Sequence, residues 1–112
     1  MIKLAARPYS RYSRDAAILL GQLIRLARIR QKLTIEQLAE RGGLSRGLVH
    51  RIEKGDLGCA IGSVFETAAI VGVRLFDAAP AALTSAMAAN SATLTLLPQS
   101  VRLSAKAVKD DF

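Results

Sequence analysis

Apolar residues recur at helical spacing through the middle of the chain. Between residues 15 and 32 one face of a helical wheel carries Leu20, Ile24, Ala27 and Gln31, and Leu19, Leu23 and Leu26 widen it. Asp15 is placed to cap the start of this helix. Shorter periodic segments follow at 35–42, 46–54 and 61–73, and turn residues separate them. The pattern therefore predicts an all-α domain over residues 15–76.

The residues around the second and third segments are those that start and stop helices. Thr34 is expected to be an N-cap, with Gln37 completing a capping box. Gly42-Gly43 ends that helix, because glycine readily adopts the left-handed conformation of a C-terminal cap. Ser45 then caps the next helix, so only a tight turn separates the two.

Outside this domain the sequence changes character. Residues 1–14 are basic, contain Pro8 and lack a period, which indicates a flexible arm. Residues 77–92 are rich in alanine and predict one further helix, with Pro80 in its first turn, to give five helices in all. Residues 93–112 look like a short strand-like piece followed by a tail, a segment that could become ordered only against a protein partner.

The third helix separates two kinds of residue. On a wheel at about 100° per residue, one side carries Leu48, Val49, Ile52 and Glu53, and the other carries Arg46, Gly47, His50, Arg51 and Lys54. The second side is basic and holds no acid. Gly47 is unusual there, because it presents bare backbone where a helix that reads a surface would normally carry a side chain.

Charge is concentrated in the same half of the chain. The net charge is +7, and residues 1–54 hold twelve Lys or Arg against four acids, whereas residues 55–112 hold four against five. A polyanion that binds one half of the protein would explain this asymmetry. A basic surface that is merely solvated is the alternative.

Few other chemistries are open to the chain. Cys59 is the only cysteine and His50 the only histidine, so neither a disulfide, a metal site nor a catalytic arrangement is indicated. Enzymatic activity and a cofactor are not expected. No apolar run approaches the ~20 residues that span a bilayer, so we expect a cytoplasmic protein without a membrane partner.

Two helices joined by a tight glycine turn, with Ala39, Gly43 and Val49 at fixed spacing, resemble the helix-turn-helix of the XRE, Cro and phage-repressor family. The spacing has physical reasons, because Ala39 is small where the helices cross, Gly43 permits the turn and Val49 fills the core between them. The resemblance covers residues 20–76 and implies a phage-repressor-like fold that binds a double-stranded DNA operator.

Carried over residue by residue, the resemblance implies two sets of functional positions. The family's buried ion pair falls on Arg28 and Glu53, with the alternative that Arg28 merely joins the basic surface. The DNA-facing positions fall on Thr34, Ser45, Arg46, Gly47, His50, Arg51 and Lys54. Arg46 and Arg51 are expected to read bases, because the guanidinium fork matches guanine, and Lys54 is expected to contact phosphate.

Three positions are less well defined by the resemblance. Family members often have glutamine where this chain has Gly47 and Ile35, so the base and phosphate contacts expected there are missing. Gly47 instead allows the start of the helix to approach DNA more closely. His50 either contacts a groove or is simply exposed.

Residues 50–77, together with the terminal residues from 96 onward, look like the HipB-type antitoxins found beside HipA-type kinase toxins. In that group the helical domain dimerises, represses its own operon and holds the toxin, so the resemblance implies a homodimer and a HipA-like partner. An autonomous XRE-family regulator without a toxin is one alternative. An adaptor that binds only protein is another, and the basic face of the third helix argues against it.

Overall fold

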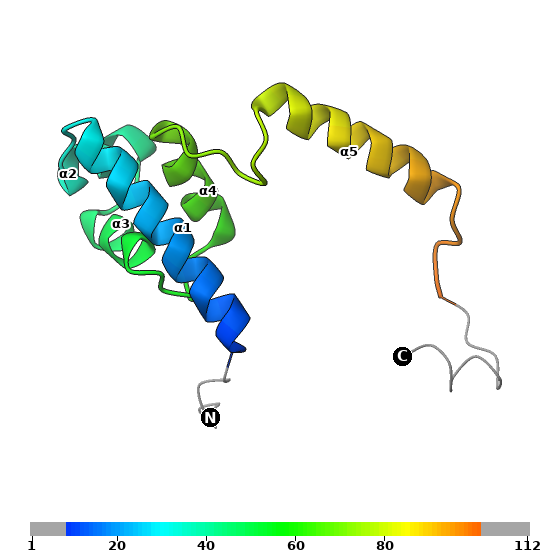
Figure 1. Ribbon diagram of the computed structural model, residues 1–112, viewed down its shortest axis with the longest axis horizontal. Coiled ribbons are helices and arrows are strands. Elements are labelled where there is room, and N and C mark those ends of the chain that lie inside the picture. Colours follow the sequence, from blue (N-terminus) through cyan, green and yellow to red (C-terminus); the bar gives the residue numbers. More distant parts are fainter. Residues whose placement is uncertain (1–8, 102–112) are drawn as a thin grey trace. The chain divides into compact units, whose positions relative to one another are not determined.

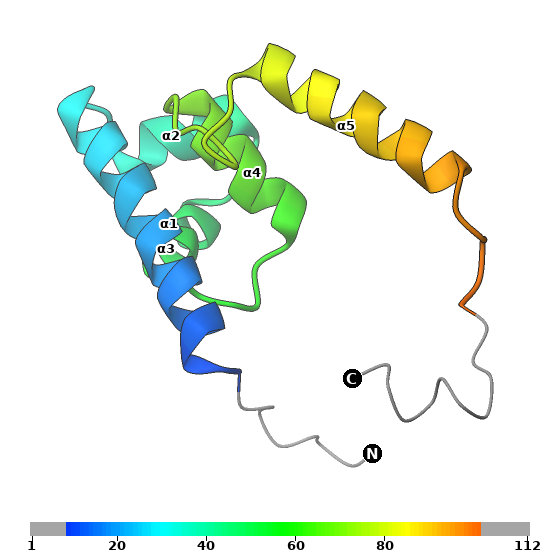
Figure 2. The same ribbon diagram turned by 45° about the vertical axis from the view of Figure 1, so that its right-hand side comes forward.

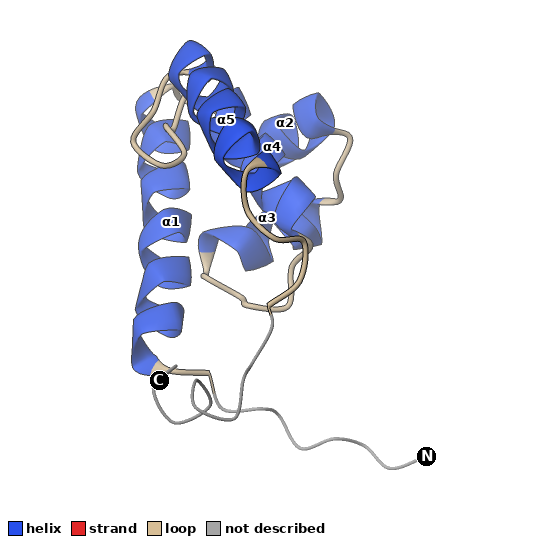
Figure 3. Ribbon diagram, turned by 90° about the vertical axis from the view of Figure 1, so that its right-hand side faces the viewer, coloured by secondary structure: helices blue, strands red, loops and turns tan. Residues whose placement is uncertain are grey.

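The structure is a computed structural model that describes residues 9–101. Over this range it contains five helices (Figure 1): α1 (Arg11–Arg30), α2 (Ile35–Gly42), α3 (Arg46–Glu53), α4 (Ile61–Ile70) and α5 (Pro80–Thr95). The chain divides into two units, residues 1–77 with α1 to α4 and residues 78–112 with α5. Residues 9–101 contain no strand (Figure 3), so the predicted all-α fold with five helices is confirmed.

The first helix begins earlier than the hydrophobic pattern predicts. Ser10 is the N-cap of α1, and its hydroxyl accepts a hydrogen bond from the Ser13 backbone N–H at 3.1 Å. The start predicted at Asp15 is therefore wrong, and residues 11–14 belong to the helix rather than to an arm. Periodicity could not locate this start, because residues 11–14 lie outside the buried core.

The core of the first unit forms where α2 crosses α3 and α4 and where α1 packs on α3. Its buried apolar side chains are Ile24, Leu38, Ala39, Val49, Ile52, Ala68 and Val71. Figure 2 shows α1 to α4 packed together in the first unit. The expected core positions of Ala39 and Val49 are confirmed, because these residues are 4% and 0% exposed.

The buried face of α1 is narrower than the predicted one, because Ile24 is buried and Leu20 and Ala27 pack against the core as predicted, but the leucines that were to widen the face do not. Its buried residues are Gly21, Ile24 and Arg28. The three leucines predicted to widen the apolar face, Leu19, Leu23 and Leu26, are instead 55%, 42% and 47% exposed. A Cβ on Gly21 would stand only 2.5 Å from the Ile52 carbonyl oxygen, so the absence of a side chain lets α1 lie directly against the end of α3. A wheel built on apolar residues misses a contact that is made through glycine.

Turn residues place α2 and α3 as the sequence predicts. The Thr34 hydroxyl accepts from the Gln37 N–H at 3.0 Å while the Gln37 side chain accepts from the Thr34 N–H at 2.9 Å, which confirms the capping box. Gly43 ends α2 in the left-handed conformation, at φ 63°. The Ser45 hydroxyl caps α3 by accepting from the Leu48 N–H at 3.1 Å. Local hydrogen bonds therefore hold this turn in addition to the core.

The helix of the second unit continues through residues expected to leave it. Pro80 lies in the first turn of α5, as predicted. The strand-like piece expected from residue 93 is wrong for Thr93, Leu94 and Thr95, which are helical. The hydroxyls of Thr93 and Thr95 donate to backbone carbonyls one turn earlier, at 3.1 and 2.9 Å. These bonds satisfy the polar threonine side chains within the helix, although the alternation of threonine and leucine is typical of a strand. No residue of α5 is buried.

Two expectations concern the ends of the chain. The predicted flexible arm and the end of the predicted tail, residues 1–8 and 102–112, lie outside the described residues. Within residues 9–101, none of the helices combines the length and the apolar character that a membrane span requires.

Candidate nucleic-acid interface

The third helix presents one face to the core and a basic face to solvent. Its buried residues are Val49, Ile52 and Glu53. The residues of the opposite face are all exposed, and they are Arg46, Gly47, His50, Arg51 and Lys54. No acid of α3 lies on the exposed face, because Glu53 is its only acid and is buried. The structure therefore divides the helix as the wheel does.

The buried acid of α3 is neutralised from α1. Arg28 Nε donates to Glu53 Oε2 at 2.6 Å, and Arg28 Nη2 donates to Glu53 Oε1 at 3.0 Å. The third nitrogen, Nη1, donates to the Leu33 carbonyl at 2.8 Å. Arg28 and Glu53 are 9% and 8% exposed, so Arg28 lies in the interior and not in the basic surface. One guanidinium thus ties together α1, the turn before α2, and α3.

The exposed Arg51 also has an acidic partner, which the sequence pattern did not suggest. Arg51 Nε donates to Asp56 Oδ2 at 2.8 Å, with the two side chains 51% and 39% exposed. The Arg51 guanidinium holds the pKa of the Asp56 carboxyl below its ordinary value, and a hydrogen bond from the Gly58 N–H adds to this effect. Asp56 lies in the loop after α3, so a wheel of the helix alone could not reveal the pair.

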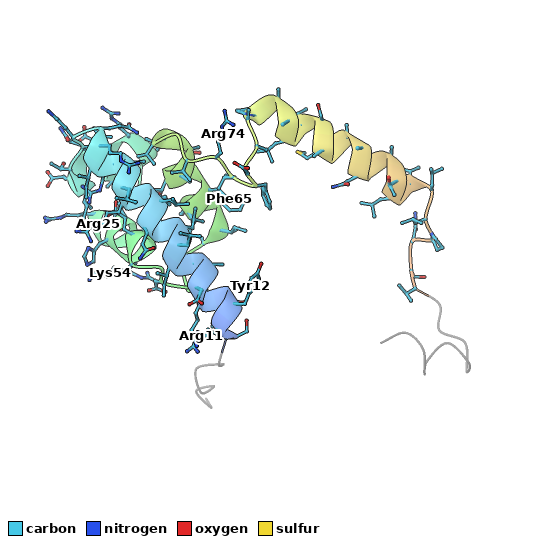
Figure 4. All side chains as sticks on the ribbon, in the orientation of Figure 1. Arg11, Tyr12, Arg25, Lys54, Phe65 and Arg74 are labelled. Carbon is cyan, nitrogen blue, oxygen red and sulfur yellow. The ribbon has the colours of Figure 1, made fainter. Side chains whose placement is uncertain are left out.

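A polar cleft of about 390 Å³ brings α1 to the basic face of α3. Its lining includes Gln22 and Arg25 from α1 together with His50 and Lys54. Figure 4 shows Arg25 and Lys54 on the same side of the first unit. Arg25 is therefore a cation of this surface that sequence reasoning did not select. The only signal in the sequence for Arg25 is its position, three residues before Arg28 on the same helix, and the structure shows it exposed.

A second cleft, of about 580 Å³, joins the starts of α2 and α3. Thr34 and Arg46, two positions predicted to face DNA, both line it, and Lys32 lines it as well. Lys32 was not predicted. Lys32 lies in the turn before α2 and has a positive φ of 58°. A helical pattern of apolar residues does not predict such a turn conformation, so it could not place Lys32 at this cleft. Glu36 also lines this cleft and lowers its positive charge.

Gly47 has no packing role within the domain. A Cβ built at this position meets no atom within 4 Å. The glycine is therefore not required by close approach of another described element, in contrast to Gly21. Bare backbone one residue into α3 is left open to solvent, beside the cap made by Ser45.

Comparison with known proteins agrees with this geometry. A family model described as a helix-turn-helix domain matches residues 19–73, a span that contains most of α1 and all of α2, α3 and α4. No curated protein and no solved structure matched the chain. Residues 19–73 therefore have a helix-turn-helix fold, in which α2 and α3 are the two helices joined by the turn at Gly43.

Proposed function

We propose that the chain is a transcriptional repressor that binds double-stranded DNA by placing α3 in the major groove. The observation that carries this proposal is the exposed basic face of α3. The only acid of that helix, Glu53, is buried against Arg28. The major groove admits an α-helix. A helix face without exposed acid avoids repulsion from the phosphates on either side of that groove.

The exposed residues divide by chemistry into two roles. Arg46 and Arg51 present guanidinium groups that can donate two parallel hydrogen bonds to guanine, so we assign them to base reading. Lys54 is a point charge suited to phosphate. Thr34 and Ser45 lie at the N-termini of α2 and α3, where backbone N–H groups favour phosphate, and Gly47 lets that backbone come close.

His50 and Arg25 extend the same surface. Both line the cleft between α1 and α3, as Lys54 does. We assign His50 to a groove contact and Arg25 to phosphate. The proposed footprint thus includes α1 as well as the two helices of the motif.

Repression is proposed to require a homodimer. Proteins that use this motif bind two half-sites about 34 Å apart, and the symmetry of the site mirrors the symmetry of the protein. An inverted repeat in the operator is therefore part of the proposal.

The finer proposal is that the protein is a HipB-like antitoxin that binds a HipA-like toxin. The second unit supports a protein partner, because α5 buries none of its residues and leaves Met87 and Leu94 66% and 67% exposed. An autonomous regulator of the XRE family, without a toxin, is the alternative. It is favoured if the product of the adjoining reading frame does not bind this chain.

Selection of duplexes from a randomised pool tests the DNA-binding proposal. The full-length protein is expected to enrich one sequence that contains an inverted repeat. A pool that remains random after repeated rounds would contradict the proposal, and enrichment of an unpaired half-site would contradict the homodimer alone.

A further inference from the structure

An acid stands beside the basic face of α3, and the backbone around it fixes its position. The Asp56 N–H donates to the Arg51 carbonyl at 3.1 Å, and Asp56 Oδ1 accepts from the Gly58 N–H at 2.7 Å. The preceding residue, Gly55, lies against α1, where a Cβ would stand 2.7 Å from Ile18 Cα. The turn therefore fixes the carboxylate through Oδ1, and Oδ2 is the oxygen that contacts Arg51.

The contact with Arg51 differs from the buried pair of the same domain. Arg28 engages all three of its guanidinium nitrogens, two with Glu53 and one with a carbonyl. Arg51 is bound through Nε, and among residues 9–101 neither of its Nη groups has a hydrogen-bond partner. With Nε bound to Asp56, the edge formed by the two Nη groups remains able to donate to O6 and N7 of guanine.

A negative charge at this place has a cost for DNA binding. An acid beside a DNA-facing helix repels phosphate and lowers affinity for every sequence alike. The pair is also half-exposed, and exposed ion pairs add little to stability. The hydrogen bond to the Gly58 N–H explains an oxygen acceptor at this position, but neither general affinity nor the turn requires the negative charge of Asp56.

We propose that Asp56 is a positioning residue for sequence recognition, which holds Arg51 through Nε so that its Nη groups face a guanine and not a phosphate. The inference rests on the proposed DNA-binding function and adds to it a determinant of specificity outside α3. A long arginine side chain loses less rotamer freedom on binding when it is already oriented. Asp56 thus favours one geometry of Arg51, and with it one base pair.

This role predicts that loss of the Asp56 charge lowers discrimination between base pairs without lowering affinity for unrelated duplex. The variant Asp56→Asn keeps an oxygen that can accept from the Gly58 N–H, so the turn is retained while the charge that anchors Arg51 is removed. Discrimination against duplexes changed at the base pair read by Arg51 is expected to fall by about fivefold or more. Affinity for unrelated duplex is expected to stay the same or to rise by up to about threefold, with a salt dependence steeper by up to about one unit of slope.

The experiment uses full-length protein and the duplex selected from the randomised pool, with fluorescence anisotropy on that duplex, on each of its single-base variants and on unrelated duplex. Glu40→Gln is the matched control, because it removes one exposed acid of the same domain from α2. Circular dichroism of each variant reports whether the helices remain. The control is expected to leave discrimination at every base pair unchanged.

Arg51→Ala and the double variant Arg51→Ala with Asp56→Asn provide a second test. If Asp56 acts through Arg51, the double variant discriminates no less well than Arg51→Ala alone. Equal weakening on selected and unrelated duplex, an unchanged base preference in Asp56→Asn, or additive losses in the double variant would each overturn the inference. A wild-type protein with no preference for any duplex would instead overturn the proposed function.

Discussion

Arg28 of α1 and Glu53 of α3, 25 residues apart in the chain, are joined by two hydrogen bonds of 2.6 and 3.0 Å in the interior of the domain. This pair fixes the helix that carries the basic face to the longest helix of the first unit. It also removes the only acid of α3 from the surface. One contact therefore serves both the fold and the electrostatics of the proposed DNA interface.

Loss of Glu53 is expected to destabilise the domain strongly. Glu53→Ala leaves the Arg28 charge buried without its partner, which costs roughly 3 to 5 kcal/mol of unfolding free energy. Chemical denaturation followed by circular dichroism measures it, with Glu40→Ala as the exposed control. A double replacement of Arg28 and Glu53 by apolar residues is expected to recover much of the loss. Equal denaturation midpoints for Glu53→Ala and Glu40→Ala would contradict this account.

Arg51 and Lys54 are expected to differ in the kind of DNA binding that they support. Arg51→Ala should cost about 1 to 3 kcal/mol on the selected duplex and relax the preference at one base pair, because a base contact carries sequence information. Lys54→Ala should weaken selected and unrelated duplex alike and reduce the salt slope by about one. Anisotropy titrations at several salt concentrations measure both. An unchanged affinity of Arg51→Ala for the selected duplex would show that another face of the domain reads the bases.

The Arg51–Asp56 pair can be detected by its effect on titration. The pKa of Asp56 is lowered first by the hydrogen bond from Arg51 and then by the Gly58 N–H, so in Arg51→Ala it is expected to rise toward the ordinary value of an aspartate. A lowered carboxyl pKa contributes stability above the unfolded value, and this contribution is lost as pH falls through the folded value. Carbon-detected NMR of the carboxyl group follows the titration. Identical Asp56 titration curves in both proteins would mean that the pair does not form in solution.

The exposed apolar side chains of α5 are expected to bind a protein. Leu94→Asp should reduce recovery of the co-expressed product of the adjoining reading frame by about tenfold or more, because a buried leucine at an interface cannot be replaced by a charge without loss. Ser85→Asp, a change to the same charge at an exposed position on the opposite side of the same helix, is the control. Duplex binding by the isolated protein should stay within about threefold of wild type. Equal recovery by all three proteins would show that Leu94 does not contact the partner, and failure of all three to recover it would favour the autonomous regulator. A change in the molecular mass of the free Leu94→Asp protein would show that α5 joins two copies of this chain.

Local chemistry was the part of the fold that the sequence predicted best. The caps at Thr34 and Ser45 and the turn at Gly43 depend on neighbours within a few residues, so their residue types are sufficient to place them. The start of α1 was misplaced because two residues compete as caps, and the choice of Ser10 over Asp15 leaves no mark on the apolar period.

Relationships between elements were harder to predict. The outward position of Leu19 follows from the glycine contact between α1 and α3, which depends on the crossing of two helices. Asp56 meets Arg51 only because the loop after α3 turns back at Gly55. Of the proposed DNA interface, the pattern therefore selected the residues on α3 and missed those that other elements bring to it, Arg25, Lys32 and Asp56.

The close approach at Gly21 offers a site at which one substitution would make folding of the domain sensitive to temperature. Only a hydrogen atom separates α1 from the carbonyl groups of Ile52 and Glu53, so even a methyl group must push the helices apart. Overpacking of this kind costs typically 1 to 3 kcal/mol, and each kcal/mol lowers the melting temperature of a small domain by roughly 4 to 8 °C. Gly21→Ala would thus give a temperature-sensitive variant, folded at low temperature and unfolded at higher temperature. A shift in growth temperature would then switch off the protein in a cell.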